Sequence, residues 1–354
     1  MRYKKKPADK IKNLIIIALI YQLLNINLLH SQIALSKHEK KKNMFEGREK
    51  FSYNSIYDSS KVVCDSSGLL LLSGYIEVYY SYDYANPSDH NRPPFICSYN
   101  RHNEVNLNLG FIKAAYESKN YRANIALMAG TYVNANLASE PGVLKNIFEA
   151  NGGVKISKKK DLWIEGGIFP SHIGFESPVG KDCWNLTRSI LSDNSPYYES
   201  GVRVSYTSDN KKWTVRGLAL NGWQRIQRVG GNQTPALGHQ LVFSPNSTII
   251  LNSSSFVGSD DPDSVRRIRY FHNFYSIINI GKNLGIILDL DLGAQQKTKG
   301  AKVYDIWYSY ALISKYILTK KVNIAIRGEY YSDPRGVIVD ANLTNGLEVY
   351  GYSL

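Results

Sequence analysis

The sequence predicts an all-β protein, a transmembrane antiparallel up-and-down β-barrel of about 14 strands. Three observations support this fold class. Apolar and polar residues alternate with a period of two in many segments, the connections between these segments are short and long in turn, and the chain begins with a stretch typical of an export signal. A sheet with one face toward lipid and with two different ends has this pattern.

Segment 74–84 shows the two-residue period clearly, because Ile76 and Val78 alternate with Glu77 and Tyr79. In a strand, such alternation places an apolar row on one face and a polar row on the other. The period recurs in residues 105–111, 123–130, 285–293 and 322–331. We expect the outward, lipid-facing row to include Ile76, Val78, Leu107, Leu109, Leu288, Leu290, Ile324 and Ile326.

The connections between the strands differ at the two ends of the sheet. Short polar turns are expected at residues 118–120, 157–161, 208–212, 244–247, 281–283 and 314–321. Long segments are expected at residues 85–103, 134–145, 170–196, 224–236, 259–268, 295–302 and 332–345. Short periplasmic turns and long outer loops are typical of outer-membrane barrels. The predicted strands begin near residues 72, 104, 121, 146, 162, 197, 213, 237, 248, 269, 284, 303, 322 and 346.

Aromatic residues cluster at the strand ends, where amphipathic rings form interfacial girdles. The candidates are Tyr80, Tyr82, Tyr84, Trp163, Tyr197, Tyr198, Trp213, Trp223, Tyr330, Tyr331, Tyr350 and Tyr352. A secreted β-sandwich or propeller is the alternative for this composition, but neither requires an export signal together with long loops at one end only.

The first 31 residues predict a signal peptide. Basic residues precede an apolar stretch at residues 14–24, and Ser31 or Ser36 supplies a small residue for cleavage. An uncleaved anchor helix is the alternative, although Gln22 and Asn25 shorten the apolar stretch. Residues 32–68 are charged and rich in serine without a period, so we expect a mobile periplasmic lead-in before a barrel at 69–354.

The composition excludes a helical membrane bundle. Mean hydropathy is −0.29, and after residue 30 no apolar run reaches the roughly 18 residues that a membrane helix needs. The formal net charge of +13 is concentrated in the first 50 residues, which carry 12 Lys and Arg against 4 Asp and Glu. The rest of the chain is nearly neutral, so the charge predicts no nucleic-acid partner.

The polar rows supply the candidate pore lining. An Arg or Lys on the lipid face near mid-bilayer costs roughly 2 to 4 kcal/mol, so charged side chains belong in the lumen. Opposed acidic and basic groups there favour the passage of small polar solutes. The alternative is that these charges pair with one another and fill the interior. The predicted pore-lining residues are Glu77, Glu165, Glu199, Arg203, Arg216, Asp289, Asp291, Arg327 and Glu329.

The longest connection, residues 170–196, is the candidate constriction. It contains Trp184 and Leu191, which would be hard to leave in water, so we expect the segment to fold into the barrel mouth as a short helix. A loop that caps the barrel from outside is the alternative. The prediction places the constriction residues Lys181, Asp182 and Arg188 opposite Glu165, Glu199 and Arg203.

The cysteines allow one internal disulfide at most. Cys64, Cys97 and Cys183 are too few for a disulfide scaffold and lack the spacing of a zinc site. Cys97 and Cys183 both fall in long outer connections, so a bridge between these two loops is the better pairing. Free thiols are the alternative.

The sequence predicts no enzyme, no cofactor and no metal site. Neither closely spaced histidine ligands nor a nucleophile or phosphate-loop motif occurs, and Asp260, Asp261 and Asp263 resemble a solvated loop more than a cation site. His239 or His272 could serve a barrel-type lipid or ester hydrolase on the outer face, but neither has a recognisable Ser partner. A structural or adhesive surface barrel is a further alternative.

Four runs of residues carry a resemblance to a known family: 74–80 (GYIEVYY), 166–176 (GGIFPSHIGFE), 195–201 (SPYYESG) and 221–224 (NGWQ). They resemble the OmpL-like putative β-barrel porins, porin family 2, of Bacteroidetes-type bacteria, from about residue 69 onward. The resemblance implies an outer-membrane channel without catalytic residues to carry over. Such barrels usually end on an aromatic residue, whereas this chain ends at Leu354. A barrel of up to 16 strands is therefore an alternative to one of about 14.

The sequence therefore predicts a porin of the bacterial outer membrane. It would form a water-filled channel for passive diffusion of small hydrophilic solutes and would contact outer-membrane lipid. A homo-oligomer is left open.

Overall fold

The computed structural model describes residues 60–64, 68–339 and 346–354, so the predicted signal peptide lies outside the described residues. The described part contains one antiparallel sheet in which the strands follow one another in chain order. The strands are β1 (Ser60–Cys64), β2 (Gly68–Tyr80), β3 (Val105–Ser118), β4 (Tyr121–Ala129), β5 (Ile147–Lys155), β6 (Asp161–Pro170), β7 (Tyr198–Thr207), β8 (Trp213–Leu220), β9 (Ala236–Phe243), β10 (Ile249–Gly258), β11 (Arg269–Ile280), β12 (Leu284–Gln296), β13 (Tyr304–Ile317), β14 (Asn323–Asp333) and β15 (Leu347–Ser353).

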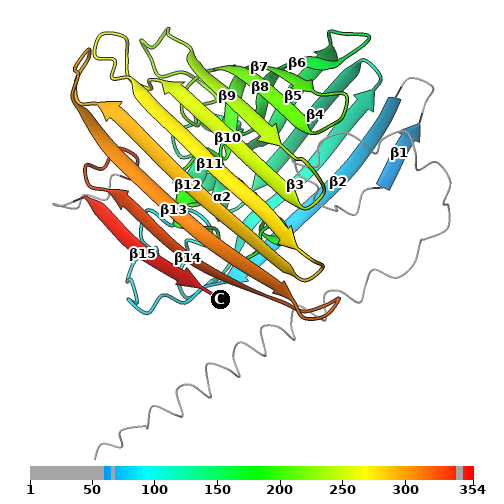
Figure 1. Ribbon diagram of the computed structural model, residues 1–354. Helices are drawn as coiled ribbons and strands as arrows, with labels where there is room; N and C mark the ends of the chain where they lie inside the picture. Colours follow the sequence, from blue (N-terminus) through cyan, green and yellow to red (C-terminus); the bar gives the residue numbers. More distant parts are fainter. Residues whose placement is uncertain (1–59, 65–67, 340–345) are drawn as a thin grey trace, which may run out of the picture. The chain divides into compact units, whose positions relative to one another are not determined.

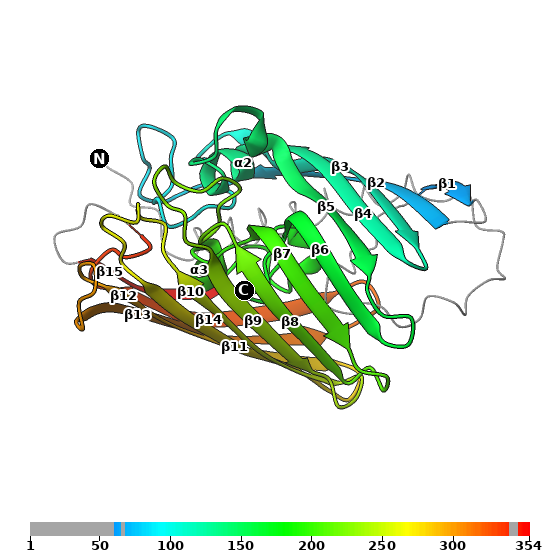
Figure 2. The same ribbon diagram turned by 90° about the horizontal axis from the view of Figure 1, so that it is seen from above.

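This up-and-down sheet confirms the predicted fold class. It curves around an interior, so that β2–β5 lie across from β8–β14 and the sheet forms the wall of a barrel (Figures 1 and 2). Within the described residues the order runs from β1 to β15, and no ladder joins these two strands. From β3 onward every strand begins within one residue of its predicted start, and the short and long connections alternate as expected.

The short helical segments belong to the long connections. They are α2 (Thr131–Asn136), η2 (Gly142–Asn146), η3 (Gly180–Asp182) and α3 (Ile190–Asp193). No helix in the described ranges combines the length and the apolar character needed to cross a membrane. One strand was not expected: β1 lies in the segment for which the sequence predicted only a lead-in.

The lipid-facing row follows the predicted alternation in most strands. Leu288 and Leu290 are exposed on β12, whereas the alternate residues Ile287 and Asp289 are buried. The same holds for Ile76 and Val78 on β2 and for Ile324 and Ile326 on β14, which are exposed on the outer face.

The prediction was wrong for Leu109, and a β-bulge explains the error. The pairing of β2 with β3 passes from Glu77 opposite Leu109 to Val78 opposite Leu107, which leaves Asn108 as an extra residue. Beyond the bulge the two faces exchange, because side chains alternate with a period of two. Leu109 is therefore 0% exposed in the interior, and Ile112 takes the outward position with 75% exposure.

The candidates for the aromatic girdle divide between the two faces of the sheet. Several of them point inward and pack in the interior, whereas the exposed candidates are Tyr80, Tyr82, Tyr84, Trp213, Tyr350 and Tyr352. These inward rings are Trp163, Tyr197, Tyr198 and Tyr331.

Two apolar clusters fill much of the interior near the long-loop end. One joins Leu109 and Phe148 of the wall to Tyr132 and Val133 of α2. The other joins Phe169 of β6 to Trp307 of β13 on the opposite side. The space left open inside the barrel is therefore narrower than the barrel itself.

Candidate functional site

Residues 171–197, called the inner loop here, connect β6 to β7 and cross the interior of the barrel. Asn185 Nδ2 donates to Ser353 Oγ of β15 (2.9 Å), and Arg327 of β14 donates from Nη1 to the Thr187 carbonyl (2.6 Å). Arg188 reaches the other side, where its Nη2 lies 3.9 Å from Glu77 Oε2 on β2. These contacts place the segment inside the barrel, and its role as a constriction stays a prediction.

The first part of the inner loop is fixed by His172. Its Nδ1 lies 2.8 Å from Glu199 Oε2 on β7, and its Nε2 lies 2.8 Å from the Ser255 carbonyl on β10. Gln240 of β9 donates to the His172 carbonyl at 2.9 Å. Three strands therefore hold the start of the loop against the wall.

The middle of the inner loop is cross-linked to itself. Glu176 Oε2 accepts hydrogen bonds from the Ser189 amide (2.7 Å) and hydroxyl (2.5 Å). Arg188 donates to the carbonyls of Ser177 and Pro178, and its guanidinium lies over the Tyr99 ring. Such a set of internal bonds favours one conformation of the loop over a mobile ensemble.

The last part of the inner loop is capped from the long-loop end by the connection between β2 and β3. Asp193 in α3 accepts from Ser98 Oγ (2.9 Å) and from the amide of Cys97 (3.2 Å). Burial raises the pKa of the Asp193 carboxyl, and the nearby Arg188 partly offsets this rise. The two long connections are thus joined by hydrogen bonds.

They are not joined by a disulfide. Cys97 and Cys183 are both free thiols, so the predicted bridge is wrong. The inner loop turns into the barrel, where Cys183 Sγ donates to the Ser177 carbonyl of its own loop (3.3 Å). Burial raises the pKa of the Cys183 thiol to about 12, so it stays protonated at neutral pH.

All nine predicted pore-lining residues lie on the inner face of the sheet and are buried or largely buried. Glu165 illustrates their environment, because it lies 2.6 Å from Arg122 and 2.7 Å from Arg203. On β14, Arg327 Nε donates to Glu329 Oε1 at 2.9 Å. Opposite charges on the inner face of the sheet thus compensate each other in these clusters.

The other inward charges also have partners in the interior. Asp289 and Asp291 both accept from Asn273 Nδ2, at 2.7 and 2.8 Å, and Arg216 donates to Gln240. The ion pairs of Glu165 and Arg327 agree with the alternative that these charges pair with one another, whereas Asn273 and Gln240 are neutral partners. Which of these groups meet a passing solute stays a prediction.

The expected contacts of the constriction residues differ from those found. The carboxylate nearest to Arg188 is that of Glu77, because Glu199 bonds to His172 instead. Lys181 and Asp182 lie together in η3, and Asp182 faces a cavity.

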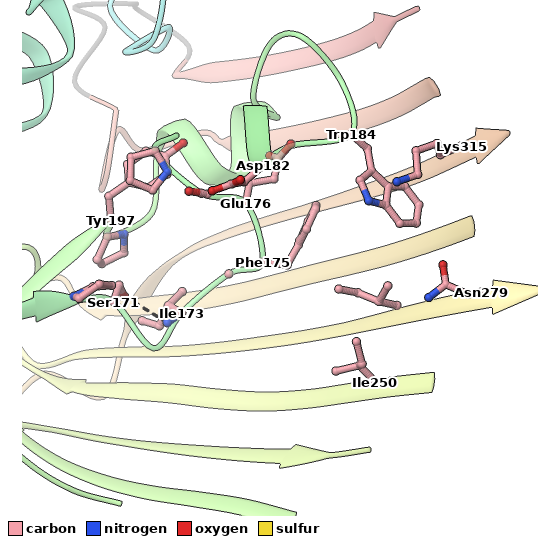
Figure 3. A pocket seen from close by; sticks show the side chains of 16 residues that line it. Ser171, Ile173, Phe175, Glu176, Asp182, Trp184, Tyr197, Ile250, Asn279 and Lys315 are labelled. Carbon is pink, nitrogen blue, oxygen red and sulfur yellow. Dashed lines mark hydrogen bonds between the residues drawn. The ribbon is translucent and has the colours of Figure 1, made fainter. Parts of the chain in front are cut away.

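This cavity, of about 480 Å³, lies between the inner loop and the wall formed by β10, β11 and β13. Figure 3 shows the carboxylates of Glu176 and Asp182 close together on the loop side, with Trp184 and Lys315 at the far end. Asn279 and other residues of the wall come from the strand ends next to the short turns. In barrels of this kind that end is periplasmic.

A second polar cluster lies on the outer face of the barrel. His239 Nδ1 lies 2.5 Å from Ser255 Oγ on the neighbouring strand, and the His272 ring is 6.1 Å from the His239 ring. Leu237 and Leu241 flank His239 on the same face and are exposed. The polar cluster thus interrupts an apolar surface.

The acidic residues of the β10–β11 connection form ion pairs. Asp261 accepts from Arg267 Nε at 2.8 Å, and Asp260 lies 3.5 Å from Arg269. In the described ranges, no group of three or more His, Cys, Asp and Glu residues is arranged to hold a metal ion.

Sequence comparison identifies the family of this barrel. A model of the family described as "Putative beta-barrel porin-2, OmpL-like" matches residues 70–354. The chain belongs to this porin family. It is therefore a porin-type barrel of the bacterial outer membrane.

No curated protein matches this porin in sequence. Among solved structures it is similar to in-vitro folded OmpT, an outer membrane protein of Vibrio cholerae, with 8% identity, a TM-score of 0.39, and coverage of 82% of this chain and 94% of OmpT. It is also similar to the outer membrane channel DcaP of Acinetobacter baumannii, with 9% identity, a TM-score of 0.40, and coverage of 83% and 97%.

Sequence reasoning missed three residues of the porin's interior, two in the inner loop and one on the wall. His172 and Glu176 lie in the run GGIFPSHIGFE, which was noticed for its resemblance, and nothing in their spacing indicates their partners. Arg122 was missed because the carboxylate that it pairs with, that of Glu165, lies two strands away in the sheet. Only the folded sheet brings these groups together.

Proposed function

We propose that this porin is a channel for passive diffusion of small hydrophilic solutes, narrowed by the inner loop. One observation carries the proposal: the inner loop crosses from β2 to β14 and β15 and leaves a cavity of about 480 Å³ beside the wall. The cavity has polar side chains on both sides, Asp182 on the loop and Asn279 on the wall, which suits hydrated solutes more than wholly apolar ones. Solutes would pass between the loop and β10–β13.

Planar-bilayer recording on the refolded protein tests the proposal. We expect stepwise single-channel conductance, and a variant without residues 181–193 should conduct more and admit larger solutes. Shortening the exposed connection at residues 297–302 is the matched control, and it should leave conductance unchanged. Absence of conductance in the folded protein would reject the channel, whereas equal conductance in the 181–193 deletion would reject only the constriction.

The outer face favours a second candidate function, hydrolysis of lipid esters. Ser255 Oγ would attack the ester carbonyl carbon while its proton passes to His239 Nδ1. The departing alkoxide would take that proton as its C–O bond breaks, and water would then release the fatty acid from Ser255. Both side chains lie where acyl chains meet the barrel.

Fatty-acid release from phospholipid in mixed micelles tests this second candidate. Activity should disappear in Ser255→Ala and persist in Ser253→Ala, which removes the neighbouring outward hydroxyl. A wild-type protein that releases no fatty acid rejects the hydrolase and leaves the channel proposal intact.

A further inference from the structure

Asp182 and Glu176 line the cavity beside the inner loop, and each of their carboxylates has one buried oxygen without a donor. Asp182 Oδ2 and Glu176 Oε1 are buried and have no hydrogen-bond partner among the described residues. The nearest cation to Glu176 Oε1 is Arg327 Nη1, at 4.0 Å, which is beyond hydrogen-bond distance. Buried acceptors of this kind gain strongly from a donor, and a charged donor gains most. The loop side of the cavity is therefore suited to an ammonium group.

The surroundings of Asp182 strengthen this preference. Burial raises the pKa of the Asp182 carboxyl, while Lys181 and Arg188 act in the opposite direction. A carboxylate that has lost part of its hydration regains stabilisation when a cation approaches it.

The far end of the cavity has the opposite charge. Lys315 Nζ lies 4.2 Å from the centre of the Trp184 ring, which holds the ammonium at this end. Asn279 of β11 adds an amide at the same end of the cavity (Figure 3). These groups are suited to a carboxylate.

Apolar side chains separate the two charged ends. Phe175 belongs to the inner loop, whereas Ile250 and Ile277 belong to the wall. An inorganic ion or a sugar would leave this surface without a partner, whereas an aliphatic side chain would cover it. The volume of about 480 Å³ lies within the roughly 300 to 1,000 Å³ of small-molecule pockets.

We propose that this cavity is a binding site for zwitterionic solutes of amino-acid size. The ammonium of the solute contacts the Asp182 carboxylate, with the buried carboxylate of Glu176 behind it. The carboxylate of the solute contacts Lys315 and Asn279, and its aliphatic part lies between Phe175 and the wall. The inference rests on the proposed channel function, because solutes reach the cavity through the lumen. It names the class of solute that the channel selects.

Equilibrium binding to the refolded protein in micelles tests the inference independently of conductance. The probes are leucine, isoamylamine, which lacks the carboxylate, and isocaproate, which lacks the amine. Leucine should bind about tenfold more tightly than either analogue, since each analogue loses one charge-assisted contact. Isocaproate that binds as tightly as leucine would overturn the inference.

Variants locate the site. Asp182→Asn and Lys315→Gln should each weaken leucine binding about tenfold, whereas Asp209→Asn, at an exposed turn, should have no effect. Heat-modifiable mobility on gels verifies folding of each variant, and two substitutions at opposite ends keep the test decisive if one of them fails to fold. Unchanged binding in a folded variant overturns the assignment, and conductance measured in parallel shows whether the channel itself is intact.

Discussion

His172 and Glu199 fasten the inner loop to the barrel wall, with 2.8 Å between Nδ1 and Oε2 and both side chains buried. The second ring nitrogen of His172 lies 2.8 Å from the Ser255 carbonyl. A carbonyl oxygen only accepts hydrogen bonds, so His172 Nε2 is the donor in its contact with Ser255. One side chain thereby links the loop to β7 and to β10.

Gly238 leaves the space that this link requires. A Cβ atom at Gly238 would lie 2.8 Å from His172 Nε2 and 3.0 Å from the Ser255 carbonyl. We predict that Gly238→Ala displaces His172 and destabilises the barrel by about 1 to 3 kcal/mol. Urea unfolding in micelles measures the loss of stability, and limited proteolysis measures exposure of the inner loop.

Gly217 on the neighbouring strand is the control for this substitution. A Cβ atom there meets nothing within 4 Å, so Gly217→Ala should leave both readouts unchanged. Equal behaviour of the two variants would show that His172 does not depend on this space.

Arg188 stabilises the fold of the inner loop from within. Its guanidinium is buried, bonds to the carbonyls of Ser177 and Pro178, and lies 3.9 Å from Glu77. We predict that Arg188→Met costs about 3 to 5 kcal/mol, because it leaves Glu77 and two carbonyls without their cation. The free energy of unfolding measures this cost, and a value within error of the wild type would contradict it.

Arg188→Lys separates charge from geometry. The lysine keeps the charge near Glu77 but cannot reproduce the two bonds of a planar guanidinium. We expect it to recover part of the lost stability.

The outer connection between β10 and β11 has an acid-sensitive pair. The hydrogen bonds from Arg267 lower the pKa of the Asp261 carboxyl below its ordinary value of 3.8. A depressed pKa adds stability above the ordinary value, and this stability is lost as pH falls through the folded-state pKa. The stability difference between wild type and Asp261→Asn should therefore be constant near neutral pH and shrink below pH 3.8.

Thermal unfolding of both proteins from neutral to strongly acidic pH measures this difference. A difference that persists at the lowest pH would mean that the asparagine acts through packing and not through charge.

The wall of the barrel was predictable because lipid imposes a rule on every second residue. Leu288 and Leu290 face outward for the same reason that Asp289 faces inward, and a period of two records this directly in the sequence. Leu109 broke the rule because a bulge adds one residue, and no local signal at Asn108 distinguishes it from other polar strand residues. The wall thus follows from local pattern, except where the register shifts.

The interior was less predictable because its contacts join segments far apart in the chain. The length and apolar residues of the inner loop indicated that it folds inward, but the pairing of Arg188 with Glu77 depends on the exact path of the loop. Ser255 was missed as a partner of His239 for the same reason, since only strand pairing places the two side chains together.

The width of the proposed passage depends on Trp184 and Gly285. A Cβ atom at Gly285 would lie 2.5 Å from the edge of the Trp184 ring. Gly285→Val would therefore push the ring away from β12 and toward the cavity that it lines. We predict a fall in single-channel conductance for this variant, and a rise for Trp184→Ala, which removes the ring.

The double variant decides whether the ring is the cause. If Gly285→Val acts by moving Trp184, it should have almost no effect on conductance in the Trp184→Ala background, because no ring remains to be displaced. If it reduces conductance by the same factor in both backgrounds, the valine itself narrows the passage. Recording all four proteins under one salt condition distinguishes the two, since only a coupled pair departs from additivity.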